Sequence, residues 1–345
     1  MGQDIKNIFM DSSFTGSLIL VISLILLGFI FKKANIFKES GQTFLSKLLL
    51  LILIPCMAFD AFMCDFSYES FKQNISIFIF SFVIMFLLFI LFQFLFYFKD
   101  KENYKTYSVM IVLGQMTLFT IPILKTIYQG NNEVLIASNM ITLTFRLFLY
   151  IYAYLVISKT KINAANMKVS LKNIFLNPIM ISMFLGLFIY LTQNIFFKVN
   201  INDESYSILR IDKTLPMFHL VISTLEKMTT PLAMLLVGMN LGSANLKQAF
   251  TSKKAYLLAF MRVILVPVIV LVVALITNKI GWTSFDEIQM VVLVLCFAAP
   301  LSAVVNTYCI AFNNQSYLAS DVCFLSTFMA IIALPLFYVT VRLIF

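Results

Sequence analysis

Charged residues are scarce in this chain of 345 residues. Asp, Glu, Lys and Arg together make up 12% of the sequence, whereas hydrophobic residues make up 61% and the mean hydropathy is +0.95. Soluble globular domains carry about 25% charged residues. The composition therefore excludes an ordinary soluble domain and indicates an integral membrane protein. Strand-like alternation of apolar and polar residues is also missing, which argues against an outer-membrane barrel.

The residues and motifs of common catalytic and metal sites are missing as well. Histidine occurs once, at His219, and the five cysteines show no Cys-x-x-Cys spacing. The sequence contains no Walker-type glycine–lysine loop and no His-Glu-x-x-His motif. We therefore expect neither an enzyme nor a bound metal or cofactor. The net charge is +9, but the lysines lie in short loops between apolar blocks, so no nucleic-acid partner is expected.

Long apolar blocks dominate what is present. Ten blocks have about the length that a helix needs to cross a bilayer. They lie at about 14–31, 42–63, 75–98, 107–129, 134–157, 173–193, 216–241, 255–278, 287–312 and 317–341. A cytoplasmic linker, 158–172, separates a first five-helix repeat (1–157) from a second (173–345). We predict an all-α polytopic membrane protein with ten transmembrane helices.

The distribution of lysine predicts the orientation. Lysines concentrate in the loops that follow the first, third, fifth and seventh blocks, and positively charged loops stay in the cytoplasm. Both termini are then extracytoplasmic in a multi-pass protein of the cell membrane. Because each half has an odd number of helices, the second half enters the membrane inverted relative to the first. The polar loop at 194–214 is expected to be a surface excursion.

Two blocks at matched positions are interrupted by proline. Pro122 lies in the fourth block and Pro300 in the ninth, and each follows another proline, Pro55 or Pro231, at a similar distance. Because proline has no N–H, nearby backbone carbonyls lose their helical hydrogen-bond partners. In the membrane interior such carbonyls are stable only where protein, water or substrate contacts them. Broken helices at matched positions of inverted repeats are typical of secondary transporters, whose substrate site lies at their crossover. A simple kink at each proline is the alternative.

Polar residues flank both interruptions. The residues of the fourth and ninth blocks that we expect at the substrate site are Gln115, Thr117, Thr120, Pro122, Pro300, Ser302 and Asn306. Arg146 in the fifth block is the expected partner of a carboxylate, because a guanidinium can bind one through two parallel hydrogen bonds. The alternative for Arg146 is a structural pair with a helix end or an acid.

Three further charged residues lie within apolar blocks or near their ends. Arg262, close to Lys253 and Lys254, is expected to extend to the inner membrane surface. Asp60 and Asp321 are the acids nearest the hydrocarbon. A carboxylate withdrawn from water holds a proton more tightly, so either is a candidate for carrying a coupling proton. The alternative for both is a solvated carboxylate at the membrane interface.

Several motifs carry a family resemblance over nearly the whole chain. They are Ile121-Pro122-Ile123-Leu124-Lys125 with Tyr128 and Gly130, Asn177-Pro178 with Gly186, Pro231-Leu232-Ala233-Met234-Leu235-Leu236-Val237-Gly238, and Ala299-Pro300 with Ala303, Ala311, Leu318-Ala319-Ser320, Leu325-Ser326-Thr327 and Leu334-Pro335. In this order and spacing the chain resembles the auxin efflux carrier family. The resemblance implies a scaffold domain and a transport domain that moves small organic anions, as bacterial malate and malonate permeases do. The chain departs from the family pattern at Gln115, where asparagine is usual, and at Thr117 and Thr120, where glycine is usual.

The predicted function is a secondary active transporter (permease) of small organic anions, such as dicarboxylates or an auxin-like carboxylate. It would work by alternating access, coupled to H+ or Na+, in the lipid bilayer, and a homodimer is a further expectation. The alternative is a transporter-like membrane sensor that binds a small molecule or lipid without moving it.

Overall fold

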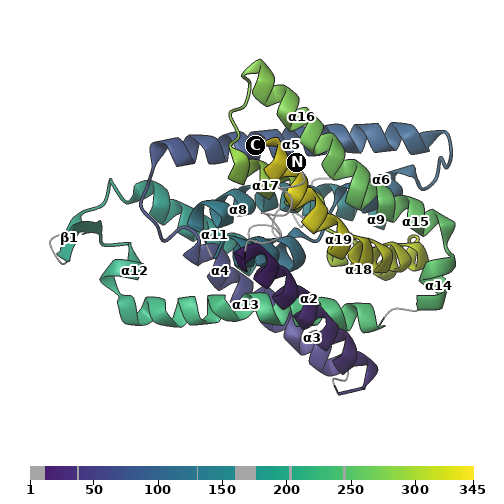
Figure 1. The fold of residues 1–345 in the computed structure, drawn as a ribbon, viewed down its shortest axis with the longest axis horizontal. Helices are drawn as coiled ribbons and strands as arrows, with labels where there is room; N and C mark the ends of the chain where they lie inside the picture. The colour runs from purple at the N-terminus through teal and green to yellow at the C-terminus, as the bar shows by residue number, and fades with distance from the viewer. Residues whose placement is uncertain (1–11, 37–38, 130, 160–175, 202–203, 244–245) are drawn as a thin grey trace.

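The computed structural model describes residues 12–36, 39–129, 131–159, 176–201, 204–243 and 246–345. These residues are overwhelmingly helical (Figure 1). The predicted linker, 158–172, lies outside the described residues except for Ser158 and Lys159.

The elements follow the predicted blocks in order. The first half contains α2 (Ser12–Lys33), α3 (Glu39–Leu48), η1 (Leu49–Leu53), α4 (Ile54–Asp60), α5 (Tyr68–Tyr97), α6 (Tyr104–Val112), η2 (Met116–Thr120), α7 (Ile121–Ile127), α8 (Asn132–Leu147), η3 (Phe148–Ala153) and α9 (Tyr154–Ser158). The second contains α11 (Pro178–Thr192), β1 (Lys198–Ile201), β2 (Glu204–Ser207), α12 (Ile211–Thr214), α13 (Pro216–Ser243), α14 (Leu246–Thr251), α15 (Lys253–Phe260), η4 (Met261–Leu265), α16 (Val266–Ile280), α17 (Glu287–Phe297), α18 (Ala303–Ala311) and α19 (Ser316–Ile344). The η segments are single π-helical turns that continue the neighbouring helices.

Among the described residues, seven continuous helices are long and apolar enough to cross a membrane, and they match the first, second, third, fifth, seventh, eighth and tenth predicted blocks. Shorter apolar helices, Met116–Ile127, Pro178–Thr192 and Glu287–Phe297, fall in the other three blocks. The chain is an all-α polytopic membrane protein, while ten crossings in two inverted repeats stay a prediction. The expected surface excursion at 194–214 contains a small antiparallel hairpin of β1 and β2, which the sequence reading missed.

Three of the four π-helical turns come directly before a proline-containing helix start. Pro55, Pro122 and Pro267 each lie in the first two residues of the segment that follows such a turn. A proline nitrogen cannot donate to the carbonyl four residues earlier, so the local hydrogen-bond register must change. At these three positions proline widens a helix by a π turn without ending it.

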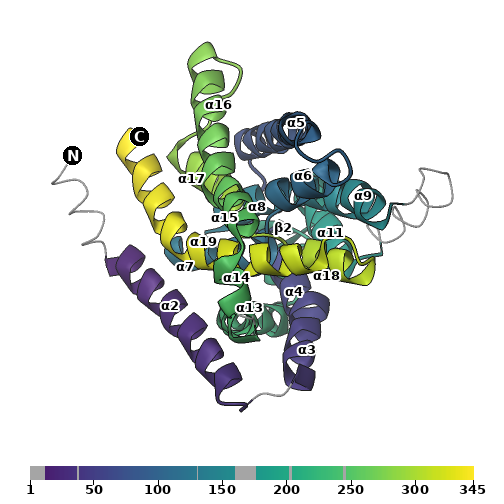
Figure 2. The ribbon, with the colours of Figure 1, turned by 90° about the vertical axis from the view of Figure 1, so that its right-hand side faces the viewer.

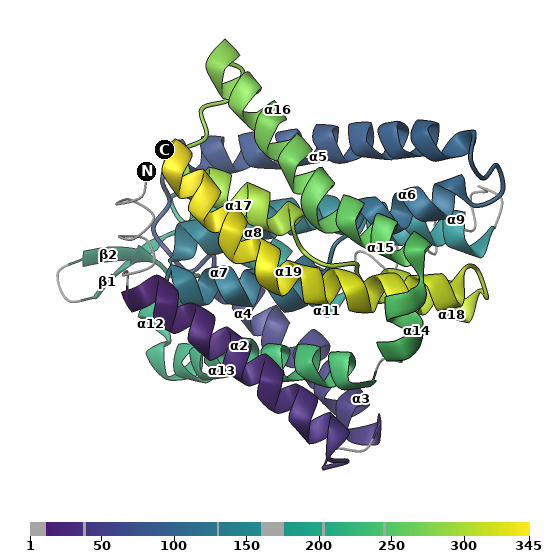
Figure 3. The ribbon, with the colours of Figure 1, turned by 45° about the vertical axis from the view of Figure 1, so that its right-hand side comes forward.

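The described helices pack as two groups. The α13 group consists of α2, α3, η1, α4, α11 and α13, whose main packing partners lie within this set. The crossover group consists of α5 to α9 and α15 to α19 with their π turns. Figures 2 and 3 show α2, α3 and α13 below the main body of the crossover group. The groups meet mainly where α13 and α2 contact η2, α7 and α19.

Glycines bring α2 and α13 into backbone contact. A Cβ atom on Gly28 would lie 2.1 Å from the Leu235 carbonyl oxygen, and one on Gly238 would lie 1.9 Å from the Ile25 carbonyl oxygen. Small residues allow such close approach between membrane helices, where van der Waals packing drives association. The α13 group is therefore a tightly packed unit.

The helices end at two opposite sides of the molecule, which we call the linker side and the terminus side. On the linker side, at the right of Figure 3, α2, α9 and α13 end. On the terminus side, at the left, α7 ends, α13 begins and the C-terminus lies.

Candidate functional site

The fourth and ninth apolar blocks are both broken, and their broken segments pair with each other. Helix α6 ends at Val112, α17 ends at Phe297, and Gly114 and Leu301 form an isolated antiparallel bridge between the two interruptions. The Gln115 N–H donates to the Pro300 carbonyl (2.6 Å), and the Ser302 N–H donates to the Leu113 carbonyl (3.1 Å). Backbone groups freed by one break thus satisfy those freed by the other, as the membrane interior demands.

The two breaks differ in their relation to proline. Pro300 lies within the second break, as predicted. Pro122 does not lie in the first break, because it is the second residue of α7 and follows the π turn η2. The chain leaves helical geometry at Leu113, where the backbone is extended. The prediction that Pro122 interrupts its helix is therefore wrong, and its effect is the π turn.

Gln115 connects the breaks through its side chain. Its Oε1 atom accepts a hydrogen bond from the Ala303 N–H (2.7 Å), the first amide of α18. The Ser326 hydroxyl accepts one from the Leu301 N–H (2.9 Å). The amino end of α18 is thereby held beside the first break.

A cavity of about 320 Å³ lies on one side of this crossover. Its walls come from the α13 group and from the crossover group, and they include the predicted site residues Gln115, Thr117, Arg146 and Ser302, together with Ser46, Tyr150, Asn177, Met116, Ala303 and Thr307. The first residues of η2 and α18 face it, and helix amino ends favour anions. We call it the Arg146 cavity.

Arg146 is a buried cation that has no acidic partner in the part of the chain that the structure describes. The residue is 4% exposed, and its Nη2 atom donates to the Thr117 hydroxyl (3.2 Å). Its Nε atom is buried and has no hydrogen-bond partner among the described residues. None of the ion pairs between described residues involves Arg146. Because an unpaired buried charge is costly, this arrangement favours an anion in the cavity.

A second cavity, of about 370 Å³, adjoins the first through a shared wall of Gln115, Leu118, Ala303 and Thr307. Its lining adds Pro300 and Asn306, also predicted site residues, and Asn240 and Ser243 of α13. The Asn306 Oδ1 atom accepts a hydrogen bond from the Ser320 hydroxyl (3.2 Å). Its polar residues are uncharged, so the positive charge at the crossover belongs to the Arg146 side.

Four predicted residues lie elsewhere. Thr120 is fully buried, its hydroxyl has no partner among the described residues, and, like Pro122, it lines neither of the two cavities. Asp60 ends α4 within the α13 group, where its Oδ1 atom lies 2.6 Å from His219 Nε2. Asp321 is 9% exposed in α19 and lines neither cavity. The structure therefore does not bring the two candidate coupling acids together.

Arg262 does not extend to the membrane surface, so this prediction is wrong. Its side chain is fully buried and donates to three backbone carbonyls at the crossover, those of Ile111, Val112 and Ala299. The sequence could not identify these partners, because they are backbone carbonyls, which every residue type carries.

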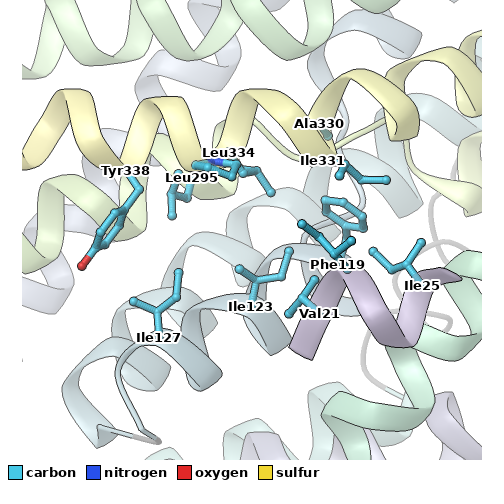
Figure 4. Close-up of a pocket in the computed structure, with 12 residues that line it drawn as sticks. Val21, Ile25, Phe119, Ile123, Ile127, Leu295, Ala330, Ile331, Leu334 and Tyr338 are labelled. Atoms are coloured by element: carbon cyan, nitrogen blue, oxygen red, sulfur yellow. The ribbon is translucent and has the colours of Figure 1, made fainter. Parts of the chain in front are cut away.

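The terminus side of the interface between the groups is closely packed. Figure 4 shows Val21 and Ile25 of α2, Phe119, Ile123 and Ile127 of η2 and α7, and Leu334 and Tyr338 of α19 around an apolar cavity of only about 20 Å³. On the same interface the Ser17 hydroxyl donates to the Thr126 carbonyl (3.1 Å).

An ion pair joins the two groups near this packed region. Lys125 of α7 pairs with the Glu226 carboxylate of α13 and also donates to the Glu226 carbonyl (3.3 Å). The two side chains are 13% and 9% exposed. Sequence reasoning missed this pair because 101 residues separate its members.

Arg210 was also missed. It is 3% exposed and binds Asp65, Asp212 and Gln193, so it joins the loop after β2 to the loop between α4 and α5 and to the end of α11. Its place in a mixed-charge loop suggested only a solvated surface residue.

Comparison with known proteins agrees with this architecture. A family model described as "Membrane transport protein", that of the auxin efflux carriers, matches residues 13–338. None of the curated proteins compared with the chain matches it significantly. Members of the matched family are membrane transporters and not enzymes. The chain belongs to the auxin efflux carrier family and is a membrane transporter.

Proposed function

We propose that the chain is a secondary active transporter of small organic anions and that it binds a carboxylate in the Arg146 cavity. The observation that carries this proposal is the buried guanidinium of Arg146, which pairs with no acidic residue among those described and lies beside the amino ends of two half-helices. The cavity volume of about 320 Å³ is within the range of small-molecule sites, about 300–1,000 Å³.

The carboxylate would accept hydrogen bonds from three kinds of donor. Arg146 offers its unpartnered Nε–H, Thr117 a hydroxyl already in contact with the guanidinium, and the first turn of η2 its backbone amides. Charge-assisted hydrogen bonds of this kind are stronger than neutral ones. Asn177 and Tyr150, which bind each other at 2.9 Å, would contact the rest of the substrate.

Alternating access would be a movement of the crossover group against the α13 group. The Arg146 cavity and the second cavity both lie between these groups. Their linings include the exposed residues Ser243 and Thr307 near the linker side. The terminus side is closed by apolar packing and by the Lys125–Glu226 pair. The described conformation therefore corresponds to a state open toward the linker side, which is the cytoplasmic side in the orientation that we propose.

Three further features complete the proposal. H+ or Na+ coupling, with Asp60 or Asp321 as a proton carrier, remains part of it, as do ten crossings in two inverted repeats. A homodimer in the cell membrane, with both termini extracytoplasmic, is the expected assembly.

The test is uptake of labelled malate, malonate and an indole carboxylate into proteoliposomes, with and without a pH gradient. Arg146→Gln should lower uptake efficiency at least about 30-fold, since truncating one partner of a buried charge pair costs about 2–5 kcal/mol. Arg342→Gln is the matched control, because it removes an arginine that pairs with Glu287 at a half-exposed position. Saturable carboxylate uptake that Arg146→Gln leaves unchanged would refute the site.

A further inference from the structure

Arg262 has an unusual set of partners for a buried charge. It lies in the π turn η4, and its side chain is fully buried. None of the ion pairs between described residues involves it. Its Nε donates to the Ala299 carbonyl (2.8 Å), and its Nη1 donates to the carbonyls of Ile111 (3.0 Å) and Val112 (2.9 Å).

These carbonyls belong to the carboxyl ends of the two broken helices. Ile111 and Val112 are the last residues of α6, and Ala299 follows the end of α17 by two residues. A helix carboxyl end carries about −0.5 of an elementary charge, so two such ends attract roughly one positive charge. In transporters with broken helices, unwound carbonyls and half-helix carboxyl ends are where a coupling cation is coordinated.

Gly114 makes room for the guanidinium. A Cβ atom at this position would lie 2.0 Å from Arg262 Nη2 and 3.0 Å from the Ala299 Cβ. Any other residue would push the guanidinium away from the paired breaks or separate the breaks themselves. The absence of a side chain at 114 and the arginine at 262 are therefore two parts of one arrangement.

We propose that Arg262 is a tethered cation that occupies the carbonyl cluster where a monovalent metal ion would otherwise be coordinated. The guanidinium neutralises the carboxyl ends of α6 and α17 and holds the two breaks together without Na+. As a positioning residue, it keeps the amino ends of η2 and α18 beside the Arg146 cavity. Any Na+ coupling of transport must then arise outside this cluster.

The first test measures stability and needs no substrate. The unfolding midpoint of the purified protein is compared in N-methylglucamine, sodium and low-millimolar guanidinium chlorides. Arg262→Ala should unfold at a lower temperature than the wild type. Sodium or guanidinium, at about 100 times its dissociation constant, should raise that midpoint by about 4 °C. The wild type and the control Arg342→Ala should not respond. A variant that responds to neither cation, or a wild type that responds equally, would overturn the proposal.

A second pair of variants covers the case in which Arg262→Ala does not fold. Arg262→Lys keeps a cation within reach of the carbonyls, whereas Arg262→Met fills similar space without charge. We expect the lysine variant to be purified as a stable protein and the methionine variant to be much less stable. A methionine variant as stable as the lysine variant would overturn the proposal, because packing alone would then explain the arginine.

Uptake provides an independent readout, and this arm rests on the function proposed above. We compare how strongly uptake depends on sodium in the wild type and in Arg262→Ala. Uptake by the variant should depend on sodium more strongly than wild-type uptake does, because sodium would take the place of the guanidinium. If no variant transports but the stability of Arg262→Ala still responds to cations, the proposed function fails while the tethered-cation assignment stands. If uptake by Arg262→Ala depends on sodium no more than wild-type uptake does, the assignment fails.

Discussion

Removing one partner of the Lys125–Glu226 pair should open the terminus side. The two side chains are 13% and 9% exposed and belong to helices of different groups. In Glu226→Gln, the Lys125 ammonium remains in the closed interface without its carboxylate. In a conformation in which α7 has moved away from α13, water solvates that ammonium, so the variant favours separation of the groups.

The size of the shift follows from the burial. Losing one partner of a buried ion pair costs about 3–5 kcal/mol. The lower figure corresponds to a change of about 100-fold in an equilibrium constant, since each 1.4 kcal/mol is a factor of ten. If the two conformations start at about 99:1 in favour of the linker-open state, such a shift leaves them about equally populated.

Cysteine labelling with a soluble maleimide measures this change on both sides of the membrane. Ile127→Cys reports the terminus side, where Ile127 is 8% exposed and lines the small apolar cavity of Figure 4. In the Glu226→Gln background its labelling rate should rise about 50-fold, from a population of about 1% to about 50%. Thr307→Cys, which lines both larger cavities, should label about half as fast.

The double variant Lys125→Met/Glu226→Gln separates the ion pair from a general loosening of the interface. Because it leaves no unpaired charge, its labelling rates should return most of the way to those of the parent. Arg342→Gln breaks an exposed pair within the crossover group and should change neither rate. Two outcomes would refute the idea that the Lys125–Glu226 pair keeps the terminus side closed: an unchanged Ile127→Cys labelling rate in Glu226→Gln, or a double variant that opens as far as the single one.

Two further substitutions test packing and binding. Gly238→Ala places a Cβ atom 1.9 Å from the Ile25 carbonyl oxygen, and overpacking of this kind should cost about 1–3 kcal/mol and lower the unfolding midpoint by about 1–4 °C. Gly16→Ala, at an open position of the same helix pair, should not lower it. Thr117→Val removes a hydroxyl that accepts from Arg146 and that would donate to the carboxylate. It should lower kcat/KM for the carboxylate about 10-fold and should also lower the free energy of unfolding, since a hydrogen bond to a charged group is worth about 1.5–3 kcal/mol. Unchanged uptake kinetics in Thr117→Val would remove that hydroxyl from the site.

Much of the candidate site could be predicted because polar residues are rare in this chain. Gln115, Thr117, Ser302 and Asn306 stand out against apolar neighbours, and the structure places each of them on a cavity at the crossover. Thr120 stood out in the same way but points to neither of the two cavities. Residue type marks a polar position in a helix, but the rotation of the helix decides which way it faces.

The position of a helix break was harder to predict than its existence. Proline is the familiar signal, and it succeeded at Pro300. At Pro122 the π turn η2 changes the hydrogen-bond register to accommodate the missing N–H, and the helix continues. The actual break lies at Gly114, where the close approach of Arg262 excludes any side chain. That contact joins residues from the fourth and eighth predicted blocks, so no local pattern records it.

The sequence by itself determined the membrane location, the helical class and the order of the apolar blocks, because each depends on composition and periodicity along the chain. It also pointed to the family, through a resemblance that ordered motifs carry. The tertiary structure alone decided the roles of the two buried arginines, which look alike in sequence. Arg262 donates from Nε and Nη1 to carbonyls of two broken helices, whereas Arg146 donates to the Thr117 hydroxyl and lines a cavity. Each guanidinium keeps one buried nitrogen without a partner among the described residues, Nη2 in Arg262 and Nε in Arg146. The function of a buried charge depends on the groups that remain to solvate it, and helices distant in the sequence supply those groups only after they have packed.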